Sequence, residues 1–207
     1  MNIQKRYKTL YSLRKTPSQG RSKATVDAIL TAAARILISS GYAKASTNRI
    51  AEVAGVSIGS LYEYFPGKEA IFAEVRRRED QRLFELMMSE PQPKSVEDMI
   101  RSTISVYLEF VQSNLDLHNA LINEVPQFAV GQLELPIYKD YLPWLTEFLH
   151  SHNAELRVNR SDQRAAQFLI FATRSTIDNY VLHIPGNLND SMVKEMLIDM
   201  VRRFLLP

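Results

Sequence analysis

The chain has 207 residues, of which 45% are hydrophobic and 23% charged, as in an ordinary soluble globular protein. It contains no cysteine, which excludes a disulfide framework, a zinc finger, an iron–sulfur cluster and a thiol nucleophile. The formal net charge is only +2, which for the chain as a whole does not suggest a polybasic nucleic-acid binder.

Targeting signals are missing from the sequence. The basic N-terminal residues are not followed by the apolar stretch of a secretory signal, and no run approaches the roughly 18 apolar residues of a membrane span. We therefore expect a cytoplasmic protein.

Residues 1–20 mix Lys, Arg, Tyr, Pro and Gly without an apolar period, which predicts a flexible basic arm. Beyond it, Gly and Pro separate segments with helical apolar spacing, and runs of alternating apolar and polar residues are missing. The prediction is an all-α fold. The expected helices cover residues 23–40, 48–54, 57–65, 68–90, 95–113, 115–125, 137–153, 162–184 and 190–206.

Helix ends are marked by residues suited to capping. Ser22 and Thr47 are the predicted N-caps of the first two helices. Gly41 is suited to the position after the first helix, and Gly55 to the left-handed turn after the second. Pro143 is expected near the start of its helix or at a kink.

The second and third helices are too short to be stable alone, because helix nucleation costs more than so few hydrogen bonds return. They must pack on another element. Ile50 on the second helix, and Leu61 and Phe65 on the third, supply apolar contacts for this packing. With Gly55 between them, the two helices form a helix-turn-helix pattern.

The third helix has the dimensions of a DNA-reading helix. Eight residues span roughly 12 Å, about the width of the major groove of B-DNA. In this motif the N-terminal residues of the second of the two helices meet base edges. In this chain that helix is the third expected one, and these residues are 57–60. Gly59 would let the backbone approach the bases. The hydroxyls of Tyr62 and Tyr64 and the charge of Lys68 could reach phosphates.

An ordered set of residues in the range 21–75 completes this pattern. It consists of Ala28-Ile29-Leu30, Ala33-Ala34, Gly41-Tyr42, Thr47, Ile50-Ala51, Ala54-Gly55-Val56-Ser57, Gly59, Leu61-Tyr62, Tyr64-Phe65 and Lys68-Glu69. With this set, the range resembles the N-terminal domain of the tetracycline-repressor (TetR) family of bacterial transcription regulators.

The resemblance implies a three-helix DNA-binding domain at residues 21–67 and a six-helix ligand-binding and dimerisation bundle at residues 68–207. It also implies a homodimer that represses transcription until a small molecule binds the bundle. The DNA contacts that it implies are Arg21, Thr47, Asn48, Ser57, Ile58, Gly59, Ser60, Tyr62, Tyr64 and Lys68. Ile58 could read a thymine methyl group or belong to the core.

A competing motif favours an enzyme. Residues 55–59 match the G-x-S-x-G nucleophile elbow, which requires a strand before Ser57 and a helix after it. A helix is expected before Ser57 instead, so we expect no hydrolase activity and no catalytic residue. The four histidines have no metal-ligand spacing, and neither a metal nor a cofactor is expected.

Aromatic residues gather between positions 107 and 148, where they could line an apolar cavity or fill an ordinary core. A small apolar or aromatic effector of unknown identity is the expected ligand. Its candidate contacts are Tyr107, Phe110, His118, Glu124, Phe128, Tyr141, Trp144, Phe148, Arg174 and Asp178.

The last two helices carry more large apolar residues than a small subunit core needs. They are the predicted dimer interface, with two helices from each subunit related by two-fold symmetry. The candidate contacts are Phe168, Phe171, Tyr180, Met196, Met200 and Phe204.

The charge is unevenly distributed along the chain. Residues 1–70 hold 11 Lys and Arg against 4 Asp and Glu, whereas residues 71–207 hold 14 against 19. The basic part coincides with the arm and the reading domain, where phosphates would be neutralised. Together with the family resemblance, this distribution predicts a ligand-responsive DNA-binding repressor on a palindromic operator. The alternative is a helical module that binds a small molecule or a partner without regulating an operator.

Overall fold

The computed structural model describes residues 12–17, 20–126 and 137–207, which form nine α-helices with short 3-10 and π turns between them. These ranges contain no strand, and the predicted all-α fold is confirmed. The chain divides into one unit of residues 1–79 and 116–134 and another of residues 80–115 and 135–207. None of the described helices is long and apolar enough to cross a bilayer.

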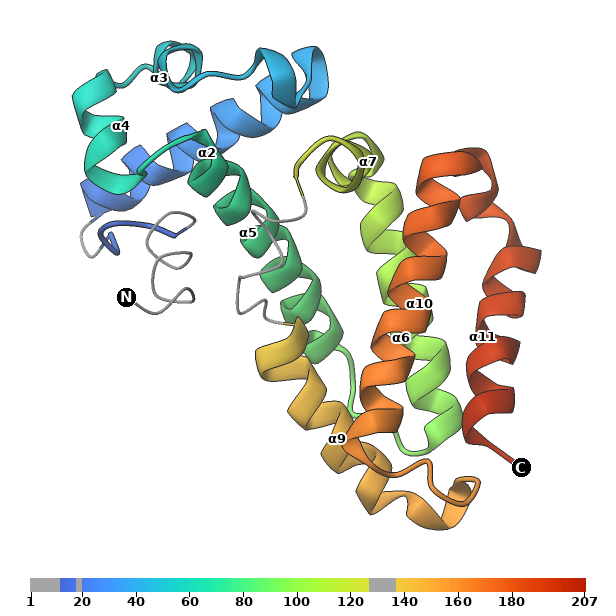
Figure 1. The fold of residues 1–207 in the computed structure, drawn as a ribbon. Coiled ribbons are helices and arrows are strands. Elements are labelled where there is room, and N and C mark those ends of the chain that lie inside the picture. The colour runs from blue at the N-terminus through green and yellow to red at the C-terminus, as the bar shows by residue number, and fades with distance from the viewer. Residues whose placement is uncertain (1–11, 18–19, 127–136) are drawn as a thin grey trace. The chain divides into compact units, whose positions relative to one another are not determined.

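The first unit is built on α2 (Gly20–Ser40), whose apolar residues recur every three or four positions and form one buried side. Helices α3 (Thr47–Ala54) and α4 (Ile58–Tyr64) both pack on α2 (Figure 1). Leu61 and Phe65 are fully buried, as predicted, and hold α4 in place. Gly55 between the two helices has φ 68°, the left-handed turn that the sequence predicts.

Two of the predicted N-caps are wrong. Thr47 is the first residue of α3, and the cap is Ser46, whose hydroxyl accepts a hydrogen bond from the backbone N–H of Arg49. Ser22 lies inside α2, which begins at Gly20. Ser57 caps α4 by accepting from the N–H of Ser60.

The loop after α2 is tied to two later helices of the same unit. This loop contains a 3-10 turn, η1 (Tyr42–Lys44). The side chain of Glu124, just after α7 (Leu115–Asn123), accepts from the backbone N–H of Tyr42 at 2.8 Å. The ring of Tyr42 packs on Phe72 of α5 (Lys68–Ser89), with 5.2 Å between the ring centroids.

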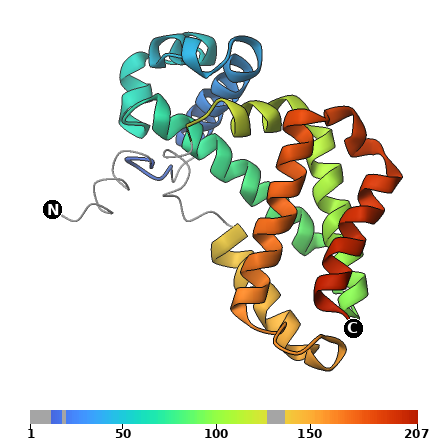
Figure 2. The ribbon, with the colours of Figure 1, turned by 45° about the vertical axis from the view of Figure 1, so that its right-hand side comes forward.

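The second unit contains the end of α5, α6 (Val96–Ser113), η2 (Ile137–Tyr141), α9 (Leu142–Ser151), η3 (Asn153–Glu155), α10 (Gln163–His183), η4 (Pro185–Asn189) and α11 (Ser191–Leu205). Helix α10 packs on α9 and α11, and α11 packs on α6 (Figure 2). Pro143 lies in the first turn of α9, as predicted, where its missing N–H removes no helical bond.

A carboxylate joins two of these helices. Both side-chain oxygens of Glu97 on α6 accept hydrogen bonds from the guanidinium of Arg202 on α11, with Nε at 2.9 Å from Oε2. The Arg101 guanidinium adds another bond at 2.7 Å. Arg202 first and Arg101 second hold the pKa of Glu97 at about 2, well below its usual range.

Candidate functional sites

The first turn of α4 presents small and apolar groups to solvent. Ser57 and Gly59 are exposed, and Ile58 is 39% exposed. Ile58 is therefore not part of the buried core, which was the alternative to a base contact. Ser60 is half-buried, and its hydroxyl is bonded to that of Ser57 at 2.8 Å.

A hydroxyl pair joins the two short helices on the exposed side. The Thr47 hydroxyl at the start of α3 lies 3.0 Å from the Tyr62 hydroxyl on α4, and Tyr62 is 41% exposed. Asn48 beside Thr47 is exposed. The structure thus joins Thr47 at the start of α3 to Tyr62 of α4 and leaves Asn48 exposed next to this pair.

Two predicted phosphate contacts have roles inside the unit. Tyr64 is 93% buried in the core, since only 7% of it is exposed. The Lys68 ammonium donates to the carbonyl oxygens of Tyr42 and Ala45, both at 3.1 Å, and lies 4.3 Å from the centre of the Tyr42 ring. Lys68 therefore uses two of its three donors to hold the loop that precedes α3.

Basic residues from the N-terminal part lie on α2 and beside α4. Arg21 is exposed in the first turn of α2. Arg14 donates its backbone N–H to the Tyr64 carbonyl at 2.8 Å and its guanidinium to the Tyr62 carbonyl at 3.0 Å. Arg14 thus satisfies carbonyls at the C-terminal end of α4 that have no helical partner.

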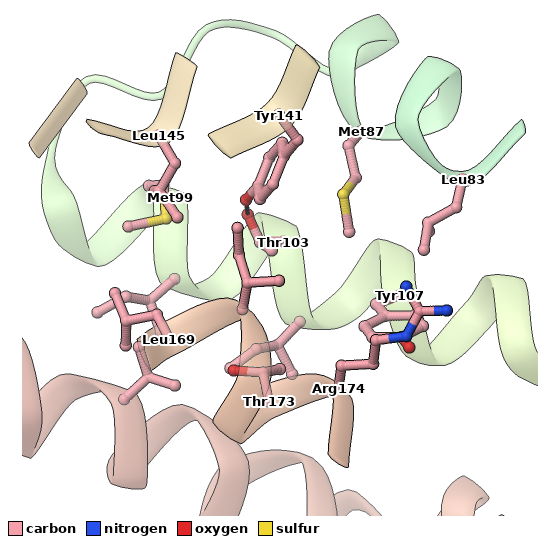
Figure 3. A pocket seen from close by; sticks show the side chains of 14 residues that line it. Leu83, Met87, Met99, Thr103, Tyr107, Tyr141, Leu145, Leu169, Thr173 and Arg174 are labelled. Carbon is pink, nitrogen blue, oxygen red and sulfur yellow. Dashed lines mark hydrogen bonds between the residues drawn. The ribbon is translucent and has the colours of Figure 1, made fainter. Parts of the chain in front are cut away.

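The second unit contains a cavity between α5, α6, α9, α10 and α11 (Figure 3). Its volume is about 50 Å³. Its lining is Leu83, Met87, Met99, Ile100, Thr103, Ile104, Tyr107, Tyr141, Leu145, Leu169, Ile170, Thr173, Arg174 and Val201. Tyr107, Tyr141 and Arg174 are therefore the predicted ligand contacts that line it.

Three polar groups of the cavity, those of Thr103, Tyr141 and Arg174, are paired with one another or with neighbours. The Tyr141 hydroxyl lies 3.2 Å from the Thr103 hydroxyl, and burial raises the pKa of Tyr141 to about 12. The Arg174 guanidinium lies 3.0 Å from a carboxylate oxygen of Asp80 and 3.9 Å from one of Asp178.

Other predicted ligand contacts lie away from this lining. Phe110 and Phe148 are buried in the same unit outside the lining, and Trp144 stacks on Tyr141 with 5.3 Å between ring centroids. His118 is buried on α7, and Glu124 binds the Tyr42 N–H, both in the first unit. Phe128 lies outside the described residues.

An exposed apolar surface covers one side of α10 and α11, which lie side by side in both ribbon views. Phe168, Phe171 and Met196 are 53%, 55% and 59% exposed. Met200 is 39% exposed, and Phe204 is half-buried with its ring stacked on Phe168 at 4.7 Å. Tyr180 is half-buried on the same helix as Phe168. We call this set of predicted dimer contacts the α10–α11 face.

Several functional groups were not predicted from the sequence. Ser46 could have been found as a cap from its position one residue before Thr47. Thr103 and Asp80 gave no such signal, because their partners are distant in the sequence. Thr103 meets Tyr141, 38 positions later, and Asp80 meets Arg174, 94 positions later.

Comparison with known proteins points to one family. Residues 29–75 match the family model of bacterial regulatory proteins, tetR family. The nucleoid occlusion factor SlmA of Glaesserella parasuis is 26% identical over 128 residues, which cover 60% of this chain and 64% of SlmA. SlmA of Haemophilus ducreyi is 28% identical over 100 residues, which cover 48% of this chain and 50% of that SlmA. The chain thus spans about half to two thirds of these relatives.

Solved structures share the fold over most of the chain. The fatty acid degradation regulator FadR of Bacillus halodurans has a TM-score of 0.68 at 21% identity, covering 91% of this chain and 96% of its own. A SmeT–triclosan complex has the same TM-score at 18% identity, and the match covers 89% of this chain and 92% of SmeT. A TetR-family transcriptional regulator of Haemophilus influenzae has a TM-score of 0.64 at 17% identity, covering 91% and 100%.

Proposed function

Because the chain belongs to the TetR family of bacterial regulatory proteins, we propose that it is a transcriptional repressor released from DNA by a small molecule. In this proposal a homodimer binds a palindromic operator. Residues 21–67 read the DNA with the basic arm of residues 1–20 beside them, and residues 68–207 bind the effector and form the dimer. The observation that carries the proposal is the exposed first turn of α4 on a helix-turn-helix unit with an excess of basic residues.

DNA reading is supported by the exposed first turn of α4. Ile58 and Gly59, with the Ser57 and Ser60 hydroxyls that are bonded to each other, form a small surface that can enter the major groove, and Ile58 is suited to a thymine methyl group. Thr47 and Tyr62, which are bonded to each other, and the exposed Asn48 and Arg21 add polar and basic groups of the kind that bind phosphates. Lys68 and Tyr64 support this surface from within the unit rather than at its exposed side.

Dimer formation is supported by the α10–α11 face, because a monomer rarely exposes so many large apolar side chains together. A two-fold dimer presents two α4 helices to successive major grooves about 34–36 Å apart, or a multiple of that distance. An operator with inverted half-sites follows from this symmetry.

Release by an effector is supported by the cavity and by the continuity of α5. Leu83 and Met87 of α5 line the cavity, while Ile71 and Phe72 of the same helix are fully buried in the DNA-reading unit. A ligand shifts the balance between two conformations only by its differential affinity for them. We infer that it favours a position of α5 in which the two α4 helices no longer fit adjacent grooves.

Three other functions are weaker. An enzyme is disfavoured because a helix, α3, precedes Ser57 where the G-x-S-x-G elbow requires a strand. A helical module that only binds a small molecule or a partner would not need an exposed reading helix.

Nucleoid occlusion, the role in the name of the curated relatives, is a second candidate that the 26% identity over 128 residues favours. If the protein occupied only a few sites on the chromosome, all of them at promoters, the repressor would be favoured over nucleoid occlusion.

Selection of bound sequences from a random DNA library tests the proposal. We expect an enriched inverted repeat, and binding that weakens steeply as salt rises. Ile58→Ala should change base preference at one position of each half-site by roughly fivefold, because one apolar base contact is lost. Ile38→Ala, which shortens an isoleucine that is 46% exposed on α2, is the matched control. A library that shows no enrichment would refute operator-specific regulation.

A further inference from the structure

We propose that the cavity takes an uncharged, mainly apolar molecule with one hydrogen-bonding oxygen, an alcohol or phenol, and discriminates against carboxylates of the same size. The oxygen would join the hydroxyl pair of Thr103 and Tyr141. This inference rests on the proposed function, in which the cavity is the effector site, and it adds the chemical class of the effector.

The lining requires an apolar ligand. Nine of the fourteen residues that line the cavity are aliphatic or methionine. Met87 and Met99 lie on opposite sides of Tyr141 in Figure 3. Methionine has three flexible bonds and fills irregular space, so these two side chains can make room for a ligand larger than the present 50 Å³.

The hydroxyl pair supplies one neutral binding point. Tyr141 is 3% exposed and its hydroxyl lies 3.2 Å from that of Thr103, in the middle of the lining (Figure 3). Burial raises the pKa of Tyr141 to about 12, so the group stays a neutral phenol that both donates and accepts. A ligand oxygen placed here completes a hydrogen-bonded set of three, whereas a carboxylate would remain a poorly compensated buried charge.

The cation of the cavity is not available to an anion. Arg174 is the one cation among the lining residues that the structure describes (Figure 3). Asp80 and Asp178 approach its guanidinium at 3.0 and 3.9 Å, and the three side chains are only 6–21% exposed. Two carboxylates already face one guanidinium, so a third would be repelled in a site with little water to screen it.

A natural reporter lies next to the site. The chain has a single tryptophan, Trp144, whose ring stacks on that of Tyr141. A small hollow contains Trp144 and also Met87, Met99, Thr103 and Tyr141 of the cavity lining. A ligand that displaces either methionine therefore changes the surroundings of the indole, and its fluorescence reports binding in the unmodified protein.

The experiment compares 1-octanol with octanoate at pH 8, where the acid is ionised. Binding is followed in the full-length chain by Trp144 fluorescence and by the rise in melting temperature. We expect octanol to bind at least about tenfold more tightly than octanoate. Equal or tighter binding of octanoate, or no binding of octanol, would overturn the proposal.

Three variants locate the binding. The double variant Thr103→Val, Tyr141→Phe keeps the shape of the pair but removes both hydroxyls, and we expect octanol affinity to fall about three- to tenfold. Asp80→Asn removes one of the two carboxylates that face Arg174 and should reduce the ratio of octanol affinity to octanoate affinity. Glu85→Gln removes an exposed carboxylate from the same helix and should leave the preference unchanged. An unchanged preference in Asp80→Asn, or an unchanged octanol affinity in the double variant, would contradict the assignment.

Failure here is distinguishable from failure of the proposed function. Enrichment of an inverted repeat from random DNA needs no ligand. A protein that selects such a repeat but ignores octanol keeps its role as a DNA-binding regulator and loses only this class of effector.

Discussion

The carboxylate of Glu124 accepts a hydrogen bond of 2.8 Å from the backbone N–H of Tyr42, 82 positions earlier in the chain. The Lys68 ammonium binds the carbonyl oxygen of the same residue at 3.1 Å. Both polar groups of the Tyr42 backbone thus bind side chains from later parts of the chain, Glu124 just after α7 and Lys68 on α5. The loop that enters the reading helices therefore owes its position to tertiary contacts.

Glycine at position 41 is required by this arrangement. Its φ is 79° with ψ 162°, a combination that side chains rarely allow, and a Cβ would come within 2.5 Å of the Glu124 carboxylate. Gly55 has φ 68° but open space around it. We expect Gly41→Ala to lower the free energy of unfolding by more than Gly55→Ala, for which about 1–2 kcal/mol is typical. Urea denaturation compares the two, and equal losses would show that Glu124 imposes no constraint.

Lys68 should stabilise the fold, which a residue that only contacts phosphate would not do. Lys68→Met keeps the apolar stem over the Tyr42 ring and removes both hydrogen bonds, so we expect a loss of about 1–2 kcal/mol in the free energy of unfolding. The exposed Lys44 of the same loop provides the control, Lys44→Met. If Lys68→Met weakened DNA binding but left thermal unfolding unchanged, its role would be the phosphate contact alone.

The ion pair between Glu97 and Arg202 should make stability depend on pH at the acidic end. The pKa of Glu97 is about 2 in the folded chain and about 4.3 when unfolded, so its contribution is complete above pH 5. That contribution is lost as pH falls from about 5 to 2. We therefore expect the difference in melting temperature between the wild type and Glu97→Gln to shrink over this range. A difference independent of pH would show that the depressed pKa has no effect on stability.

The α10–α11 face should hold the dimer together. Met196 is 59% exposed in the single chain, so Met196→Glu should leave the monomer folded but place a charge in the apolar interface. Light scattering after gel filtration should show a dimer for the wild type and a shift toward monomer for the variant. Ile38→Glu, at a residue 46% exposed on α2, should remain dimeric. Dimers that persist in Met196→Glu would place the interface elsewhere.

Local sequence signals predicted the helices well. Apolar spacing and breaks predicted nine helices in the observed order, and Gly55 and Pro143 occupy the positions that their backbone preferences dictate. Leu61 and Phe65 were predicted as core from their four-residue spacing alone.

Side-chain roles that depend on distant partners were harder to predict. Glu124 was a candidate ligand contact but binds the Tyr42 backbone, and Lys68 faces carbonyl oxygens rather than solvent. Asp80 meets Arg174 across 94 positions. Such pairs are set by helix packing, which composition and periodicity do not describe. Tyr107 and Tyr141 line the cavity while Phe110 and Phe148 fill the core, although all four belong to the same aromatic-rich stretch.

The central claim is that two copies of this chain read an inverted repeat through α4. The most direct measurement is fluorescence anisotropy with the duplex selected from random DNA, compared with the same duplex in which one half-site is scrambled. We expect two chains on each intact duplex and an affinity at least about 100-fold lower for the scrambled one, because each half-site binds one α4 helix. Equal affinity for both duplexes, or binding of one chain to each, would contradict it.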